Sequence, residues 1–235
     1  MKTFCILLSI CLSYCISSAQ VTSFAIDNSK LDVVLSSQLD SIYKLDQSVR
    51  IAYNQSKTQD ELPSVTDSLL MVMRKADHEN LIKVNAIIKK HGWLGPQKVG
   101  FNGAQGLFLV IQHADLETQE HYLPIIKEAE KKGEILSSNV AILDDRISIR
   151  KGKHQLYGSQ GFTDNQTGKK YIYPILDVDN LDIRRKAMGM PPMREYVLGW
   201  DAEHYKKELP ALEILVKHKR LNDQIADGWN GIKKF

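Results

Sequence analysis

A histidine and an aspartate stand two residues apart in the sequence QHAD, at the polar end of a mostly apolar run. An imidazole titrates near neutral pH and can act as a general base beside a carboxylate, so His113 and Asp115 are candidate catalytic residues. Asp145 is the third candidate, because Asp145 and Arg146 are charged residues set among apolar neighbours. The alternatives are structural: a histidine that caps a buried helix, and a buried ion pair.

A second set of residues is rich in hydrogen-bond donors and acceptors, which suit recognition of a carboxylate, a phosphate or a sugar. These predicted ligand-binding residues are Gln112, Arg146, Gln155, Tyr157, Gln160 and Arg184. We expect the QHAD, DR and YGSQ segments to converge on one water-accessible polar cavity.

Several other chemistries lack their sequence signatures. The chain has no nucleophile elbow, P-loop or dinucleotide fingerprint, and nothing near Ser159 predicts an activating base. His113, Asp115 and His121 form a poor zinc-ligand set, so we expect no metal and no cofactor.

The elements that position these residues are predicted to be helices. Apolar side chains surround the segment 103–115, which predicts a helix buried on most sides, and Gly103 and Gly106 allow another backbone to approach it closely. Apolar periodicity predicts further helices at 28–50, 64–90, 118–132 and 137–151, and residues 162–175 predict a β-hairpin. The expected fold is mainly α, a single compact helical domain with one small β-hairpin inserted near residues 156–175.

Composition fits an ordinary globular protein: 235 residues, 43% hydrophobic, 25% charged and a formal net charge of +3. No block of lysine and arginine stands out, so a nucleic-acid partner is not expected. We divide the chain into N-terminal helices at 20–90, a core with the hairpin at 91–198 and a helical tail at 199–235.

The first 19 residues are typical of a signal peptide. Lys2 supplies the positive start, an apolar stretch follows, and small residues precede Gln20. We expect an exported protein, periplasmic or secreted, with no membrane span after cleavage. A lipoprotein is the weaker alternative, because bulky residues precede Cys11 and Cys15. All three cysteines lie in this segment, so no disulfide is expected after cleavage.

The ordered motifs resemble a bacterial family catalogued as a domain of unknown function. The motifs are Gly-Trp-x-Gly at 92–95, Gln-His-Ala-Asp at 112–115, Asp-Arg at 145–146, Gln-x-Tyr-Gly-Ser-Gln at 155–160, and Arg-Arg at 184–185 before Gly189 and a Pro-Pro pair. The resemblance covers roughly residues 91–196 and departs where the family often has Trp-Pro and this chain has Trp93-Leu94. The resemblance strengthens the list of site residues and implies no reaction.

Two functions remain open at this stage. The first is an exported binding or interaction domain that holds a small anionic or sugar-like ligand, a peptide or another envelope component in its polar pocket. The alternative is an envelope-associated hydrolase, in which His113, Asp115 or Asp145 acts as acid or base and Arg146 or Arg184 holds substrate charge. Whether the protein is an enzyme is left open.

Overall fold

The structure is a computed structural model that describes residues 20–59, 61–164 and 166–232, with side chains described up to residue 221. The predicted signal peptide at 1–19 lies outside the described residues. Within these ranges the protein is mainly helical with a small antiparallel hairpin, as the sequence predicts.

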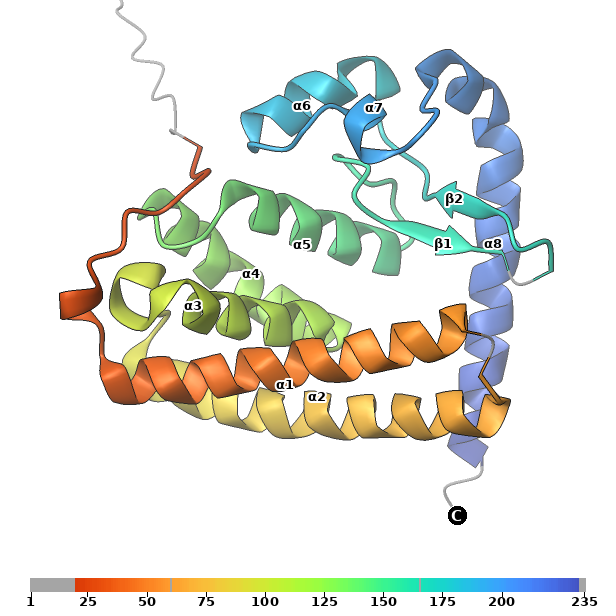
Figure 1. Ribbon diagram of the computed structural model, residues 1–235. Helices are drawn as coiled ribbons and strands as arrows, with labels where there is room; N and C mark the ends of the chain where they lie inside the picture. The colour runs from red at the N-terminus through yellow and green to blue at the C-terminus, as the bar shows by residue number, and fades with distance from the viewer. Residues whose placement is uncertain (1–19, 60, 165, 233–235) are drawn as a thin grey trace, which may run out of the picture.

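The elements follow one another along the chain as shown in Figure 1. The helices are α1 (Val33–Thr58), α2 (Pro63–His91), α3 (Pro96–His113), α4 (Leu116–Lys131), α5 (Ser137–Arg150), α6 (Leu181–Ala187), α7 (Met193–Tyr196) and α8 (Ala202–Ile232). The strands are β1 (Gly161–Thr163) and β2 (Lys170–Ile172), and single 3₁₀ turns are formed by Asn28–Lys30 and Val178–Asn180.

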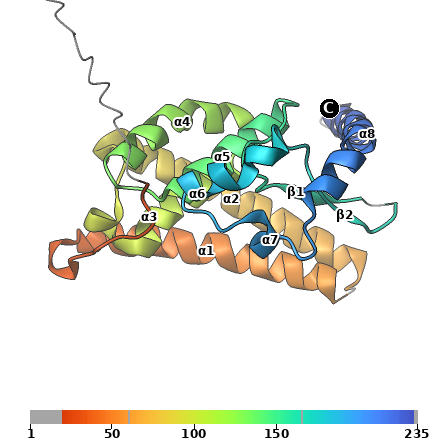
Figure 2. The ribbon, with the colours of Figure 1, turned by 90° about the horizontal axis from the view of Figure 1, so that it is seen from above.

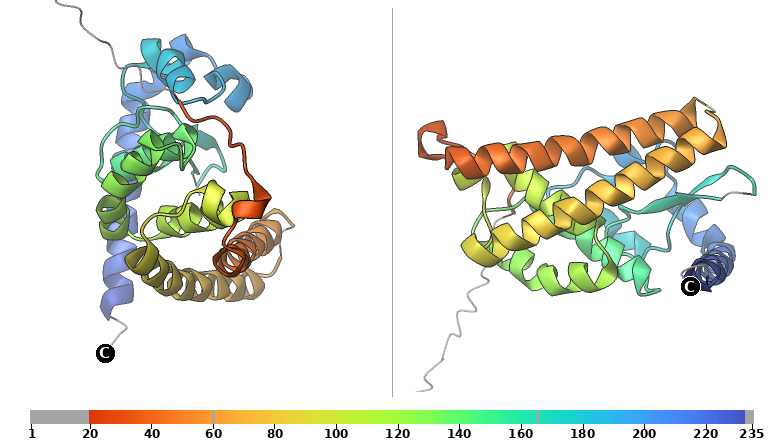
Figure 3. Two further views of the ribbon diagram at one scale, coloured as in Figure 1. Left: turned by 90° about the vertical axis from the view of Figure 1, so that its left-hand side faces the viewer. Right: turned by 90° about the horizontal axis from the view of Figure 1, so that it is seen from below.

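The long helices α1 and α2 lie side by side as an antiparallel pair along one side of the molecule (Figures 1 and 3). The helix α1 begins later than predicted, because the Asp32 carboxylate accepts a hydrogen bond from the Leu35 amide and caps it. It also continues to Thr58, beyond the predicted end at residue 50. The helix α2 begins at Pro63, where the missing N–H and fixed φ suit the first helical position.

The helix α3 is buried on most sides, which confirms the prediction for this segment. Leu107, Phe108 and Ile111 are at most 1% exposed. A Cβ atom on Gly106 would lie 2.8 Å from the Leu39 carbonyl oxygen of α1, so only glycine allows the two helices to pack this closely. Gly100 has φ 71° and interrupts the first turns of α3.

The helices α4 and α5 pack on each other and form a layer on the other side of α3 from α1 and α2 (Figure 1). The core runs through these layers, and its fully buried members include Leu39, Val84, Leu107, Ile126 and Leu143. Burial of these apolar side chains is the main source of stability for the bundle. The layers place the C-terminal end of α3 between α1 and α5.

The C-terminal part forms a second apolar cluster around the hairpin, in which Ile175, Leu181 and Met193 are buried. The strands β1 and β2 pair with Phe162 opposite Tyr171. The helix α8 flanks the hairpin (Figure 2) and lies within the helical tail that the sequence predicts at 199–235. Within the described residues, no helix combines the length and apolar character needed to cross a membrane.

Candidate functional site

The QHAD segment spans the end of one helix and the start of the next, and this separates its two candidate catalytic residues. His113 is the last residue of α3. Asp115 caps α4: its carboxylate accepts a hydrogen bond of 2.8 Å from the Thr118 amide. Hydrogen bonds from Thr118 lower the pKa of Asp115. The geometry therefore gives Asp115 a helix-capping contact and leaves His113 free to face other helices.

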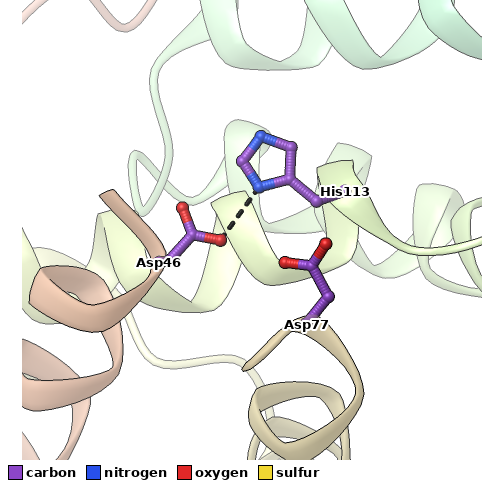
Figure 4. A group of neighbouring side chains, drawn as sticks. All are labelled: Asp46, Asp77 and His113. Carbon is purple, nitrogen blue, oxygen red and sulfur yellow. Dashed lines mark hydrogen bonds and ion pairs between the residues drawn. The ribbon is translucent and has the colours of Figure 1, made fainter. Parts of the chain in front are cut away.

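His113 is held by an aspartate that lies 67 residues earlier in the chain. Its Nδ1 atom lies 3.0 Å from Oδ1 of Asp46, a residue of α1 (Figure 4). The Asp46 side chain is only 1% exposed, and Gln47 donates a hydrogen bond of 2.8 Å to its other oxygen. Burial alone would raise the pKa of Asp46, but the hydrogen bond and charge of His113 and the charge of Arg50 outweigh it, and the pKa is lowered. Asp46 is thus a buried carboxylate that stays ionised beside the imidazole.

Arg50 and Asp77 extend this pair to a third helix. Nη2 of Arg50 lies 2.8 Å from Oδ1 of Asp77 on α2, and its Nη1 lies 3.4 Å from Oδ1 of Asp46. The same Asp46 oxygen therefore faces both the imidazole and the guanidinium. Figure 4 shows the carboxylates of Asp46 and Asp77 on the side of the ring that carries Nδ1.

Two arginines of α5 complete the arrangement. Nη1 of Arg150 donates a hydrogen bond of 2.7 Å to the carbonyl oxygen of Ala114, the residue after His113. Arg146 lies one turn earlier on the same helix, where residues four apart share a face. We call Asp46, Arg50, Asp77, His113, Arg146 and Arg150 the histidine–arginine cluster.

Arg146 differs from the other charged members of this cluster. Its Nε atom is buried and has no hydrogen-bond partner, and it forms no ion pair with any carboxylate in the described part of the chain. Burial lowers the pKa of Arg146, and the positive charges of Arg150 and Arg50 lower it further. A guanidinium without a counter-charge, close to two others, creates a site of positive potential.

The cluster has enough ligand atoms to be considered for a divalent metal ion. One ligand atom each of Asp46, Asp77 and His113 lies within 4.8 Å of the others. Both carboxylates already pair with Arg50, however, and Arg146 and Arg150 add positive charge nearby. This distribution of charge suits an anion better than a cation.

Asp145 belongs to a different network from its neighbour Arg146. Its carboxylate, which is 0% exposed, accepts hydrogen bonds from the amides of Leu156, Tyr157 and Ser159 at 2.7 to 3.0 Å, and from the Ser159 hydroxyl at 2.8 Å. Burial raises the pKa of Asp145, and these hydrogen bonds act in the opposite direction. The contacts fix the YGSQ loop to α5, which is a structural task.

The glutamines of this loop bind the loop itself. Gln155 donates hydrogen bonds through Nε2 to the carbonyl oxygens of Gln160 and Tyr173, and its Oε1 accepts from the Gln160 amide at 2.9 Å. Gln160 donates through its own Nε2 to the Ser159 hydroxyl. Tyr157 is partly buried, and burial raises its pKa. The polar atoms that the sequence offers for a ligand are largely engaged within the loop.

Arg184 and Arg185 hold the same loop from its other side. Nε of Arg184 donates to the Leu156 carbonyl oxygen at 2.9 Å, and its Nη2 also contacts the carbonyl of Asp177 at 2.8 Å. The fully buried Arg185 donates to the carbonyl oxygens of Tyr157 and Pro191 at 2.6 and 2.7 Å. Its Nη2 atom is buried without a hydrogen-bond partner, as is Nε of Arg146, but the contacts of its other nitrogens and those of Arg184 indicate a scaffold for the loop.

Gln112 is 7% exposed, and its backbone carbonyl accepts a hydrogen bond of 2.6 Å from the side chain of Gln119. The structure therefore divides the predicted residues. His113 and Arg146 lie in the histidine–arginine cluster, and Asp145, Gln155, Tyr157, Gln160 and Arg184 lie in the loop network. Asp115 caps α4.

Asp46, Arg50 and Asp77 are not among the site residues predicted from the sequence. A signal for the first was present: the buried positions of α1 are Leu35, Leu39, Ile42, Asp46, Val49 and Ser56, so a charge occupies the apolar stripe. A buried carboxylate in such a stripe requires a partner from another element. No comparable signal marks Asp77.

The larger hollows described in the structure lie away from the cluster. One of about 710 Å³ is formed between α8 and the segment after α5, and its lining includes His154 and Glu213. These two side chains lie 3.0 Å apart. None of the six cluster residues, and no residue of the QHAD, DR or YGSQ segments, lines any of the hollows described in the structure. The polar cavity that the sequence predicts for these segments is therefore not among those hollows.

Comparison with known proteins identifies the family. Residues 34–207 match the model of a family of unknown function (DUF6624), and the chain belongs to this family. The matched region includes every residue of the histidine–arginine cluster. No curated protein and no solved structure matches the chain.

Proposed function

We propose that this protein binds a small anionic ligand at the histidine–arginine cluster. The observation that carries the proposal is the Arg146 side chain, which has a buried Nε without an acceptor and no carboxylate partner in the described part of the chain. A bound anion would supply the missing acceptor. We further propose that the chain is exported and meets its ligand in the periplasm or outside the cell, because its first 19 residues are typical of a signal peptide.

Arg146 is partly buried, and a charge withdrawn from water without a partner is costly, so it is retained where another requirement outweighs the cost. In the ligand-free protein the cost is increased by repulsion, because Arg150 and Arg50 disfavour the charged form of Arg146. A bound carboxylate or phosphate offsets both the cost of withdrawing this charge from water and the repulsion between the arginines, since the planar guanidinium presents two parallel N–H donors to such a group.

The surroundings of Arg146 support an anion that enters from solvent. The side chains of His113 and Arg50 are each 17% exposed, so the cluster is not sealed. Arg150 is held against the end of α3 by its bond to the Ala114 carbonyl. An anion at Arg146 would therefore lie beside a fixed second guanidinium.

A sugar-like ligand or a peptide held by the loop residues is less well supported. Gln155 and Gln160 use their side-chain amides within the loop, and Arg184 donates to three backbone carbonyls. A ligand there would have to displace contacts that the fold uses. We therefore place recognition at Arg146.

The proposal is tested by isothermal titration calorimetry with inorganic phosphate and with sulfate. We expect both anions to bind the wild-type protein and to bind Arg146→Gln at least about tenfold more weakly, since a hydrogen bond to a charged group is worth about 1.5–3 kcal/mol. Arg74→Gln is the matched control: Arg74 is an exposed arginine of α2 outside the cluster, and its variant should bind like the wild type. Equal affinity for Arg146→Gln would contradict the proposal.

Stability of the ligand-free protein separates ligand binding from a structural role. Arg146→Met keeps the aliphatic stem and removes the unpaired charge, so the ligand-free variant should unfold at the same temperature as the wild type or higher. A lower unfolding temperature together with unchanged phosphate affinity would show that Arg146 serves the fold alone.

A further inference from the structure

The His113 imidazole is prepared for proton transfer by the residue that holds it. Because the Asp46 carboxylate is ionised and lies 3.0 Å from Nδ1, the hydrogen bond requires the proton on Nδ1. The neutral ring then carries its lone pair on Nε2. Figure 4 shows that Nε2 points away from both carboxylates.

We propose that the cluster is catalytic and hydrolyses a phosphomonoester, with His113 as the general base and Asp46 as the positioning residue. This inference rests on the proposed function, since the anion bound at Arg146 becomes the phosphoryl group of the substrate. It assigns the reaction that the anion site serves.

The choice of a phosphoryl group follows from the number of positive charges. One guanidinium is enough to hold a carboxylate, whereas here Arg146 and Arg150 lie one turn apart on the same face of α5, and Arg150 disfavours the charged form of Arg146. Arg50 is not counted, because it already pairs with Asp46 and Asp77. A phosphomonoester dianion offsets such repulsion better than a monoanion does. Guanidinium groups also stabilise the charge that develops on the oxygens of a transferring phosphoryl group.

The reaction uses water as its only co-reactant. Nε2 of His113 takes a proton from a water molecule while the water oxygen forms a bond to phosphorus. The bond between phosphorus and the ester oxygen breaks, and its electron pair stays on the leaving oxygen. The leaving oxygen takes a proton from solvent and the imidazolium releases its proton to solvent, because the attacking and leaving oxygens lie on opposite sides of phosphorus. The products are an alcohol and inorganic phosphate, and the histidine is restored.

Asp46 acts through His113 and does not touch the substrate in this scheme. Its charge stabilises the imidazolium that forms, and its hydrogen bond fixes the ring so that the free nitrogen faces away from α1. Arg50 holds Asp46 and Asp77 together and keeps the two carboxylates from repelling the incoming anion. Among the described charged groups around the imidazole, Asp46 orients the ring, and Arg50 and Asp77 neutralise each other. The arginines of α5, Arg146 and Arg150, bind the anion.

The experiment measures turnover of p-nitrophenyl phosphate and, in parallel, the affinity for phosphate and for orthovanadate. A catalyst of phosphoryl transfer binds a transition-state analogue at least about 100-fold more tightly than the ground-state anion, so vanadate should exceed phosphate by that factor. This second measurement does not depend on finding the natural alcohol.

Three variants give the expected pattern. His113→Asn keeps an amide near the position of Nδ1 for Asp46 but has no base, so kcat should fall about 100-fold or more while phosphate still binds. Asp46→Asn should lower kcat with KM changed by less than about threefold, which a loss of folded protein would not produce. His78→Asn, at an exposed histidine of α2, is the control and should behave like the wild type.

The outcomes separate the two proposals. Phosphate binding that depends on Arg146, without turnover and without preference for vanadate, would overturn the catalytic inference and leave anion binding in place. Turnover that persists in His113→Asn would overturn the role of the histidine. If neither anion binds, the proposed function and this inference fall together.

Discussion

Asp145 and Arg146 are neighbours in the sequence, yet their side chains belong to separate networks. The Asp145 carboxylate is saturated by donors of the YGSQ loop, whereas the Nε atom of Arg146 has no acceptor. Consecutive residues of an α-helix point about 100° apart, which is enough for α5 to serve a loop on one face and an anion site on another. The Asp-Arg motif therefore combines a structural residue with a proposed binding residue.

The first prediction concerns Asp145. Asp145→Asn replaces one acceptor oxygen by an NH₂ group that faces backbone amides, so we expect a loss of about 2–4 kcal/mol in the free energy of unfolding. Urea denaturation measures this loss, and calorimetry with phosphate should show unchanged affinity for the fraction that folds. A stable variant with weakened anion binding would reverse the assignment.

A second prediction follows from the close contact between α1 and α3. Gly106→Ala places a Cβ atom 2.8 Å from the Leu39 carbonyl oxygen, and backbone cannot move aside easily, so we expect a loss of about 1–3 kcal/mol. Gly103→Ala is the matched comparison, because its Cβ atom would meet mainly the Val99 side chain at 3.1 Å. It should cost less in thermal unfolding, and an equal cost would show that the backbone contact is not the cause.

Acid should destabilise the protein partly through Asp46. Burial pushes its pKa upward, but His113 and Arg50 outweigh burial and lower it from the ordinary value of 3.8. The unfolded chain then binds this proton at a higher pH than the folded chain, so the free energy of unfolding falls as the pH drops below about 3.8. Asp46→Asn should show a shallower decline over this range.

Asp145 makes the free energy of unfolding depend on pH in the opposite direction. Its pKa is raised by burial, so the folded state holds its proton more tightly than the unfolded chain does. Above pH 3.8, the contribution of Asp145 to the free energy of unfolding falls as the pH rises through its folded-state pKa. If the free energy of unfolding falls equally steeply with pH below 3.8 in the wild type and in Asp46→Asn, the prediction for Asp46 is contradicted.

The final prediction distinguishes an anion site from a metal site. In the wild type, Arg50 occupies both carboxylates, so Mn²⁺ or Zn²⁺ should not raise the unfolding temperature. Arg50→Gln frees Asp46, Asp77 and His113, whose ligand atoms lie within 4.8 Å of one another, and should make stability depend on the added ion. Strong stabilisation of the wild type by either ion would favour a metal centre.

Much of the architecture could be predicted from local patterns. The buried helix around Leu107 and Ile111, and the hairpin near Tyr171, follow from apolar periodicity and turn residues. Helix boundaries were less accurate: α1 starts at its Asp32 cap and runs past the polar residues after Arg50. Capping competes with periodicity at helix ends, and a polar stretch without glycine or proline does not stop a helix.

The site was predictable only in part. The chemistry of His113 and Arg146 marks them in the sequence, but their surroundings depend on long-range contacts. Asp46 lies on another helix, 67 positions from His113, and only the packing of α1 on α3 brings them together. The prediction that the YGSQ loop converges on this site was wrong. Asp145 and Arg184 form hydrogen bonds with the backbone of the loop instead.

The contact at Gly106 sets the spacing of the catalytic pair that we propose. Leu39 and Gly106 touch across α1 and α3, and Asp46 and His113 each lie seven residues further along their own helix. Two turns of helix therefore separate this contact from Asp46 on α1 and from His113 on α3. A small tilt of either helix about the contact would change the distance between the carboxylate and the imidazole. An event that shifts α1 against α3 would then change the rate of proton transfer without contacting either side chain.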